Sequence, residues 1–109
     1  MKIRHSAIVC CAAIGSALFA ADVTHERLVN AAKENGNWMT YSGSYRSWRY
    51  SALDQISRQN ASRLKVEWVY QMPTTLMVET TPLVIDGIMY LSEPPSNVVA
   101  IDAATGRQF

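Results

Sequence analysis

Residues Val78–Gly106 carry the clearest structural pattern in the chain: VETTPLVIDGIMYLSEPPSNVVAIDAATG. Two short apolar runs, Pro82–Ile85 and Ile88–Leu91, lie on either side of Asp86 and Gly87. An Asp-Gly pair between two such runs is the strongest short-range signal for a β-hairpin, because both central residues of a type I′ turn take a positive φ. The pattern therefore predicts a hairpin that turns at Asp86 and Gly87.

A third strand and a second turn follow this hairpin. The turn-forming residues Pro94–Asn97 precede a third apolar run, Val98–Asp102, and a further turn is expected at Ala103–Gly106. A fourth strand is predicted to begin at Arg107. Such a dense β-meander is typical of one piece of a sandwich, a barrel or a propeller rather than of a finished domain. The predicted fold class is therefore all-β, with a short N-terminal helix.

Residues 1–20 have the plan of a secretory signal peptide. Basic residues stand at positions 2, 4 and 5, an uncharged apolar run covers Ala7–Leu18, and the small residues Ala20 and Ala21 offer a cleavage point. The apolar run is about 12 residues long and falls short of the ~20 that span a bilayer, so a membrane anchor is the weaker alternative. We expect the chain to be exported and not to span a membrane.

Removal of this segment changes the charge and the thiol content. Residues 21–109 carry eight Lys and Arg against nine Asp and Glu, a formal charge of −1. That charge argues against a nucleic-acid or an anionic-membrane partner. Both cysteines, Cys10 and Cys11, leave with the signal, so the remaining sequence offers neither a disulfide nor a Cys-based metal site. A lipoprotein signal at Cys10 is a poor alternative, since no Leu stands three residues before it.

A short N-terminal unit, residues 21–36, is predicted to be helical. The helix would cover Asp22–Asn35, with Thr24 as its N-cap and Glu26 in its first turn. Gly36 directly follows and would end the helix.

An aromatic segment, Asn37–Leu53, comes next and is also rich in Ser and Gly. We expect an irregular loop that buries its large rings under a larger body. Arg46 and Arg49 between the rings would also suit single-stranded nucleic acid, but the net charge near zero argues against that alternative.

One helical turn and one strand are predicted before Val78. Asp54–Leu64 would hold the turn, capped by Ser57 or Asn60, with Ile56 and Leu64 as buried anchors. The strand covers residues 65–71, where apolar and polar residues alternate with period two. Its expected inward face is formed by Val66, Trp68 and Tyr70.

The sequence by itself offers little catalytic chemistry. It contains no Gly-rich phosphate loop, no HExxH pair and no cluster of Cys and His. The unusual residue is Glu79, which stands at the entrance to the first predicted strand. It is either a solvated charge or an inward-facing carboxylate at a strand end, where propellers and barrels assemble their sites. Composition does not choose between these two alternatives.

An ordered set of motifs resembles the quinoprotein alcohol dehydrogenases, enzymes that use pyrroloquinoline quinone (PQQ) with calcium or a lanthanide. The matching pieces, in chain order, are Asn37–Tyr45 (NWMTYSGSY), Arg49–Ile56 (RYSALDQI), the trio Asn60, Leu64 and Trp68, Glu79–Tyr90 (ETTPLVIDGIMY) and Ala100–Gly106 (AIDAATG). Together they cover nearly all of residues 37–106. Single pieces are shared with other propellers, whereas the ordered set is specific.

The resemblance implies an eight-bladed β-propeller of four-stranded antiparallel sheets, with the cofactor and the substrate on its central axis. Residues 37–109 would form the lead-in and most of the first blade, so we expect the sequence to be truncated. Ala100–Gly106 would begin the family's tryptophan-docking motif, in which Gly106 allows a tight turn. The Trp of that motif would follow directly after Phe109 and pack onto a neighbouring blade.

The resemblance assigns one cofactor-binding residue. Glu79 matches the family glutamate that contacts PQQ. The family's disulfide between adjacent cysteines, its metal ligands and its catalytic Asp base are expected downstream, so no catalytic or metal-binding residue is predicted within this chain. Cys10 and Cys11 are not that cysteine pair, because they lie in the signal.

The implied reaction is the oxidation of an alcohol to an aldehyde in the periplasm, with electrons passing from PQQ to a cytochrome c. The chain alone is expected to be inactive, because one blade cannot close a ring. One alternative is a non-catalytic propeller scaffold that binds other proteins at the outer membrane, although Glu79 favours the enzyme. Another is a short secreted β-domain that acts alone, against which its unpaired strand edge argues.

Overall fold

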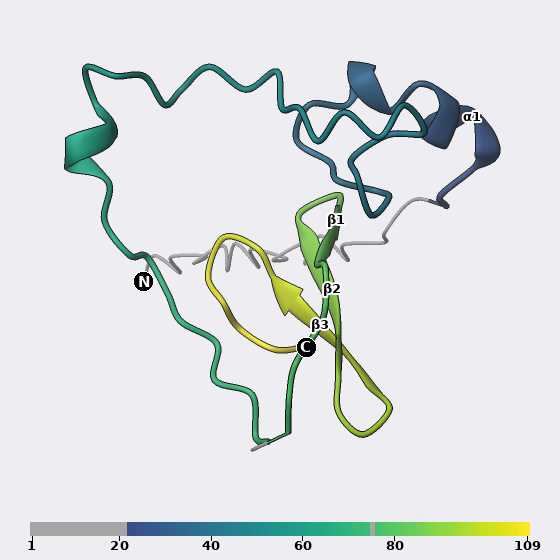
Figure 1. The fold of residues 1–109 in the computed structure, drawn as a ribbon, viewed down its shortest axis with the longest axis vertical. Helices are drawn as coiled ribbons and strands as arrows, with labels where there is room; N and C mark the ends of the chain where they lie inside the picture. The colour runs from purple at the N-terminus through teal and green to yellow at the C-terminus, as the bar shows by residue number, and fades with distance from the viewer. Residues whose placement is uncertain (1–21, 75) are drawn as a thin grey trace, which may run out of the picture.

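The computed structural model describes residues 22–74 and 76–109, so the predicted signal peptide lies outside the described residues. The elements, in chain order, are α1 (His25–Val29), the 3-10 helices η1 (Ala31–Lys33) and η2 (Ala61–Arg63), and the strands β1 (Leu83–Ile85), β2 (Ile88–Glu93) and β3 (Asn97–Asp102). Figure 1 shows that the short helices precede the strands along the chain. The predicted all-β character with a short N-terminal helix agrees with this arrangement.

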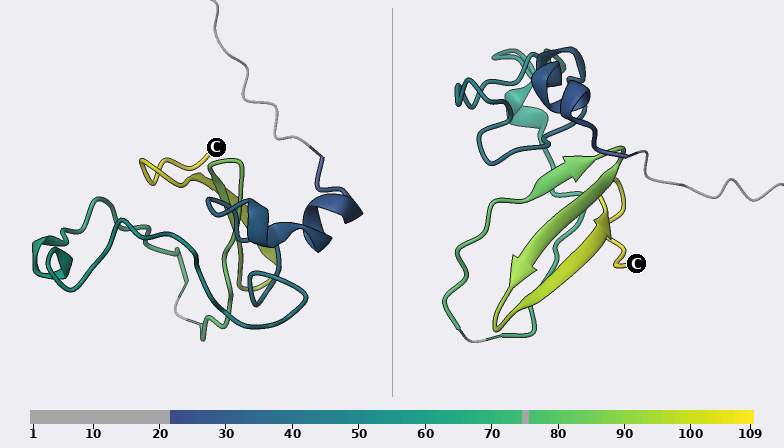
Figure 2. Two further views of the ribbon diagram at one scale, coloured as in Figure 1. Left: turned by 90° about the horizontal axis from the view of Figure 1, so that it is seen from above. Right: turned by 90° about the vertical axis from the view of Figure 1, so that its right-hand side faces the viewer.

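The three strands form one antiparallel sheet in the order β1-β2-β3, and Figure 2 shows its twist. Ile85 pairs with Ile88 across the first turn, where Asp86 has a φ of 51° and Gly87 a φ of 81°. Both central residues therefore take the positive φ of a type I′ turn, and the hairpin prediction is confirmed. The second hairpin pairs Glu93 with Asn97 across the predicted proline-rich turn.

The chain turns back again after β3. The Asp102 carboxylate accepts hydrogen bonds from the backbone N–H groups of Ala104 and Thr105, at 3.0 and 2.9 Å. These bonds lower the pKa of Asp102, because they favour its ionised form. Beyond the turn, Phe109 donates its backbone N–H to the carbonyl of Ala100 at 3.0 Å. The predicted fourth strand thus appears as a single bridge, Ile101 to Gln108, beside β3.

The core lies on one face of the sheet. Leu91, Val99 and Ile101 are buried there, and Trp68, Tyr70 and Met72 pack over them. Trp68 and Tyr70 therefore face inward, as the alternation in residues 65–71 predicts. The predicted strand itself is not formed. The reason is that this extended segment crosses the face of the sheet instead of lying beside an edge, so no strand is available for pairing. Val66, predicted to face inward, is 80% exposed.

The N-terminal helix is shorter than predicted. The Thr24 hydroxyl accepts a hydrogen bond from the backbone N–H of Arg27, as expected of the N-cap. The α-helix ends at Val29, and only the 3-10 turn η1 follows. The side-chain amide of Asn30 donates to the carbonyl of Glu26, which is a local bond that competes with continued helix.

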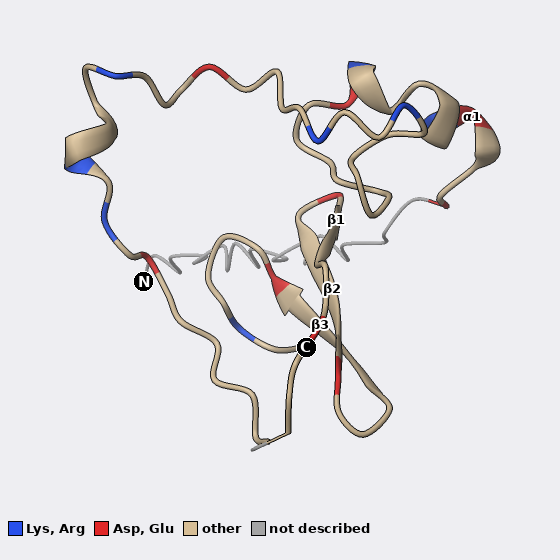
Figure 3. Ribbon diagram, in the orientation of Figure 1, with Lys and Arg blue, Asp and Glu red and all other residues tan. Residues whose placement is uncertain are grey.

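Two sets of contacts join this N-terminal segment to the first hairpin. Trp38 and Val84 exchange both backbone hydrogen bonds, at 2.7 and 3.0 Å. Arg27 lies between two carboxylates, 2.7 Å from an oxygen of Glu34 and 2.7 Å from an oxygen of Asp86. Figure 3 shows the acidic tip of the hairpin beside the helical segment. The two sets together cover part of the outer edge of β1.

The middle of the chain loops away from the sheet (Figure 1). The predicted helical turn is present as η2, and the Asn60 side chain accepts a hydrogen bond from the backbone N–H of Ser57 at 2.7 Å. The prediction that Ile56 and Leu64 are buried anchors is wrong. Ile56 is 63% exposed and Leu64 is 64% exposed. They are exposed because nothing in the described residues packs over this part of the chain.

The aromatic segment differs from its prediction in the same way. Trp38 is half-buried, and its ring lies against Gly43. The other rings of the segment are exposed, namely Tyr41, Tyr45, Trp48 and Tyr50. Arg46 stacks over Trp48 and Arg49 over Tyr41, each about 5.1 Å from the ring centre.

In residues 22–74 and 76–109 no helix is long and apolar enough to cross a bilayer.

Candidate functional site

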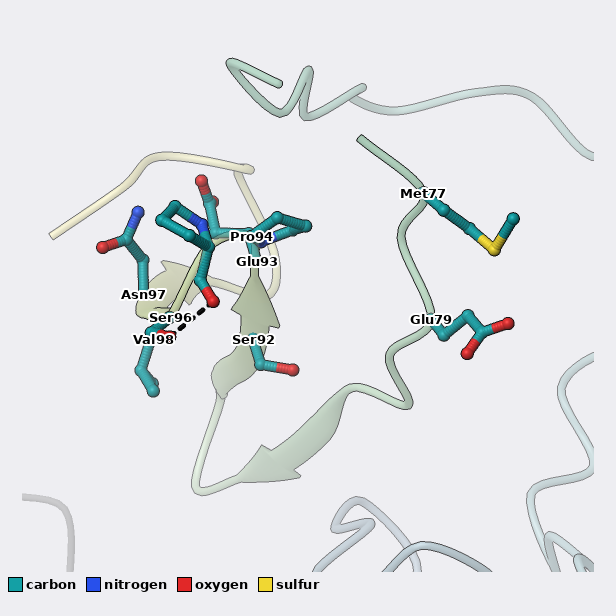
Figure 4. Close-up of a pocket in the computed structure, with 9 residues that line it drawn as sticks. Met77, Glu79, Ser92, Glu93, Pro94, Ser96, Asn97 and Val98 are labelled. Atoms are coloured by element: carbon teal, nitrogen blue, oxygen red, sulfur yellow. Dashed lines mark hydrogen bonds between the residues drawn. The ribbon is translucent and has the colours of Figure 1, made fainter. Parts of the chain in front are cut away.

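Glu79 lies in the extended segment that leads into β1, and its side chain is exposed. It lines a shallow hollow of about 460 Å³, whose other walls come from the end of β2 and the turn that follows. Figure 4 shows Met77 and Glu79 on the segment before β1, and Ser92 to Val98 on the second hairpin. The remaining residues of the hollow are Ser92, Glu93, Pro94, Pro95, Ser96, Asn97 and Val98.

The carboxylate of Glu79 is available for a ligand. Among the described residues it forms neither an ion pair nor a hydrogen bond, so the fold does not use its charge. Its backbone is nevertheless held in place: the hydroxyls of the next residue, Thr80, and of Ser92 lie 3.1 Å apart. The backbone N–H of Ser92 also donates to the Thr80 hydroxyl at 3.3 Å. Glu79 is therefore a solvated charge within this chain, and its role as a cofactor contact stays a prediction.

A second carboxylate, Glu93, was missed by the sequence reasoning. Its side chain is only 5% exposed, at the end of β2 and on the same face as Leu91. The hydroxyl of Tyr70 donates a hydrogen bond to it at 2.7 Å. This bond, together with burial, raises the pKa of Tyr70. The available signal was position: Glu93 is two residues after Leu91 and therefore points to the core side of a strand.

Trp68 packs closely against the turn that follows β3. Its Nε1–H donates to the carbonyl of Ala103 at 3.1 Å. Its ring lies on Gly106, which has a φ of +73° and no side chain to separate the two. The Trp expected directly after Phe109, which would pack onto a neighbouring blade, stays a prediction. Within the described residues, Gly106 of the Ala100–Gly106 motif packs against Trp68.

The described residues hold no cluster of three or more His, Cys, Asp or Glu side chains that would bind a metal ion.

The second hollow, of about 680 Å³, lies between the N-terminal helices and the aromatic segment. It contains Trp38, Tyr45, Trp48 and Tyr50 among its walls. These rings give that hollow an apolar character, whereas Glu79 makes the first hollow acidic.

Comparison with known proteins identifies relatives for most of the chain. Residues 38–109 match the family model described as PQQ, the β-propeller domain of glucose/ethanol/alcohol dehydrogenases. The dehydrogenase subunit of the quinone alcohol dehydrogenase of Gluconacetobacter polyoxogenes is 48% identical over 84 residues, which are 77% of this chain and 11% of that protein. The 1-butanol dehydrogenase (cytochrome c) of Thauera butanivorans is 40% identical over 73 residues, which are 67% of this chain and 11% of that protein.

A solved structure extends the likeness to three dimensions. The quinohemoprotein alcohol dehydrogenase ADHIIG of Pseudomonas putida superposes with a TM-score of 0.76 at 45% sequence identity. The superposition covers 80% of this chain and 13% of that one. The chain thus spans only about a ninth to an eighth of the length of the relatives it matches.

Proposed function

Because the chain belongs to the family of PQQ β-propeller domains of glucose/ethanol/alcohol dehydrogenases, we propose that it forms part of an enzyme that oxidises alcohols to aldehydes with PQQ. The observation that carries this proposal is the match of residues 38–109 to the family, supported by a TM-score of 0.76 to a quinohemoprotein alcohol dehydrogenase. The relatives named above are all dehydrogenases, so the scaffold alternative has no support among them.

The finer features of the proposal come from the resemblance and from the names of the relatives. We propose that the whole protein is an eight-bladed propeller in the periplasm, to which residues 1–20 direct it. A cytochrome c would accept the electrons, in keeping with the name of the Thauera butanivorans relative. Calcium or a lanthanide would be bound by residues outside the described part of the chain. The catalytic Asp would also lie outside it.

Glu79 would contact one edge of PQQ. The hollow beside it is open, and its carboxylate is free of other partners among the described residues. PQQ, when bound, supplies a quinone that accepts two electrons. Glu79 would accept a hydrogen bond from an N–H of the ring system and so orient it. The Thr80–Ser92 contact would keep the Glu79 backbone in position while the carboxylate binds.

The test is the variant Glu79→Gln in the whole protein, with PQQ affinity measured by fluorescence titration. Gln keeps the size of the side chain but removes the charge, so we expect about a tenfold loss of affinity, which corresponds to the ~1.4 kcal/mol of one charge-assisted hydrogen bond. Glu67→Gln is the matched control, because Glu67 is also exposed and does not line the hollow. Equal PQQ affinities for the two variants would show that Glu79 does not contact PQQ. A protein that binds PQQ but oxidises neither ethanol nor 1-butanol would overturn the proposed function.

A further inference from the structure

Asn35 and Gly36 are the central residues of a turn between η1 and Trp38. A backbone hydrogen bond from the N–H of Asn37 to the carbonyl of Glu34, at 2.9 Å, closes this turn. Both central residues are exposed. A Cβ built on Gly36 would meet no atom within 4 Å. Water therefore has access to both residues from the side of the turn.

The side chain of Asn35 and the nitrogen of Gly36 are both unbonded. Among residues 22–74 and 76–109, neither the Asn35 side-chain amide nor the Gly36 backbone N–H takes part in a hydrogen bond. Closure of the turn needs only the N–H of its fourth residue, so the N–H of its third residue has no partner within the turn. Gly36 also has no side chain to shield its nitrogen. This nitrogen and the amide carbon of Asn35 are therefore able to approach each other.

The other asparagines are protected by their surroundings. Asn97 is followed by Val98, whose branched side chain crowds the backbone nitrogen. Asn35 is thus the one asparagine of the described residues that is both unbonded and followed by Gly. The remaining asparagines hold their side chains in hydrogen bonds, namely Asn30, Asn37 and Asn60.

We propose that Asn35-Gly36 is a site of spontaneous deamidation, whose products loosen the N-terminal segment from the first hairpin. The Gly36 nitrogen loses its proton and bonds to Cγ of Asn35, while the bond from Cγ to Nδ2 breaks and ammonia leaves. Water then opens the resulting succinimide ring at one of its two carbonyls. The product is aspartate or isoaspartate at position 35, and water is the only co-reactant.

Both products disturb the contacts beside the turn. Each places a new carboxylate next to Glu34, which shares Arg27 with Asp86, and charges of the same sign repel. Isoaspartate also lengthens the main chain just before Asn37. The Asn37 side chain donates to Glu34 at 2.7 Å and to Asp86 at 3.3 Å, so a shift of this residue strains both bonds. The modified segment is therefore held less firmly on the hairpin.

The first test is peptide mapping of the whole protein by mass spectrometry, after storage in warm and mildly alkaline buffer. Base favours removal of the attacking proton, and deamidation adds about 1 Da. The tryptic peptide of residues 34–46 contains both Asn35 and Asn37, which fragmentation distinguishes. Asn35 should be lost at least about tenfold faster than the other asparagines, because only its neighbour lacks a side chain. Equal rates at Asn35 and Asn97 would overturn the proposal, and so would an Asn35 that stays intact.

Gly36→Ala tests the mechanism without removing Asn35. The φ of Gly36 lies outside the left-handed region and the space around it is open, so Ala fits there without strain. The added methyl should slow the loss of Asn35 at least about tenfold, because it crowds the attacking nitrogen. An unchanged rate would overturn the mechanism.

Ala61→Gly is the matched control, because it creates a second Asn-Gly pair at Asn60. The Asn60 side chain donates to the Gln55 carbonyl at 2.7 Å, and the N–H of residue 61 donates to the Ser57 carbonyl at 2.9 Å. Asn60 should therefore still be lost more slowly than Asn35. Equal rates would show that the contacts of the turn do not select the site, and would overturn the structural argument.

Hydrogen exchange tests the loosening itself. The Trp38 N–H donates to the Val84 carbonyl at 2.7 Å. This amide should exchange at least about threefold faster in the stored protein than in the fresh protein, because the contact opens more often. Stored Gly36→Ala should keep the slow rate. Isoaspartate at position 35 with unchanged exchange of Trp38 would overturn the loosening. None of these readouts needs PQQ or an alcohol, so they are independent of the proposed function.

Discussion

The indole of Trp68 lies directly on Gly106, so closely that a Cβ built there would be 2.6 Å from the ring atom Cδ2. No real Cβ approaches a ring atom to that distance, so Gly106 serves both the turn and the packing. The same indole donates to the Ala103 carbonyl in the same turn. One aromatic side chain thus fastens residues 65–71 to the end of β3.

Gly106→Ala should destabilise the protein by about 2–5 kcal/mol. About 1–2 kcal/mol comes from the left-handed backbone and about 1–3 kcal/mol from the overlap with Trp68. Gly87→Ala is the control, because Gly87 has a similar φ of +81° and open space around it, so only the backbone cost remains. The two variants are compared by urea unfolding of the same protein. Equal losses would show that Trp68 does not press on Gly106 in solution.

Trp68→Phe should cost about 1–2 kcal/mol of stability. The phenyl ring keeps part of the apolar contact but leaves the Ala103 carbonyl without its donor. Trp48→Phe is the matched control, since Trp48 is 68% exposed and should change stability by less than about 0.5 kcal/mol. Thermal unfolding followed by circular dichroism distinguishes them. A cost at Trp48 as large as at Trp68 would contradict the contact described.

Tyr70 should ionise at a higher pH than an ordinary tyrosine. Its hydrogen bond to Glu93 holds the phenolic proton and raises its pKa above the ordinary 10.0. A raised pKa means that this contact contributes stability in full below pH 10.0, and that the contribution is lost as the pH rises through the folded-state pKa. Absorbance at 295 nm should show a late step in the titration of the tyrosines that belongs to Tyr70. Tyr70→Phe should abolish that late step, and a late step that persists in the variant would assign it to another residue.

The pair formed by Arg27 and Asp86 should couple the N-terminal segment to the first hairpin. In a double-mutant cycle of Arg27→Gln and Asp86→Asn, the two losses should not add, because either change breaks the same contact. Arg58→Gln combined with Asp86→Asn is the control cycle and should be additive. Additive losses for Arg27 and Asp86 would mean that the pair contributes nothing in solution.

The contact between Arg27 and Glu34 should make the stability of the protein depend on pH in the acidic range. Its hydrogen bond to Glu34 lowers the pKa of that carboxyl below the ordinary 4.5. A lowered pKa means that the contribution is present above pH 4.5 and is lost as the pH falls through the folded-state pKa. Unfolding midpoints measured between pH 6 and pH 3 should therefore fall less steeply in Arg27→Gln than in the parent protein. Parallel pH profiles for the two would contradict this prediction.

The sequence was sufficient for the β-meander because its signals are local. Asp86-Gly87 fixes its own turn through positive φ, and the short turns on either side of β2 set the register of the three strands without help from distant residues. It was also sufficient for the Thr24 cap, which needs only a side chain and an N–H three residues apart. The family resemblance, in turn, came from motifs and not from geometry.

The sequence was insufficient where the outcome depended on a distant partner. Ile56 and Leu64 have the composition of buried anchors, but burial needs a surface that the described residues do not provide. Residues 65–71 have a strand pattern, but a strand needs a neighbour to form its hydrogen bonds. Glu93 was overlooked because an acidic residue is normally exposed, and Tyr70, its partner, is 23 residues away. The role of Glu79 depends on a ligand and stays a prediction.

The separation of Arg27 from Asp86 along the chain determines an order of assembly. The two are 59 residues apart, whereas each hairpin of the sheet closes over a few residues. Hairpins form in about 1–10 μs, but a ribosome adds only about 5–20 residues per second. Asp86 is therefore synthesised several seconds after Arg27, and the hairpin it belongs to can close almost at once. The N-terminal segment has to wait for its acceptor, so for those seconds it stays undocked and within reach of chaperones and proteases.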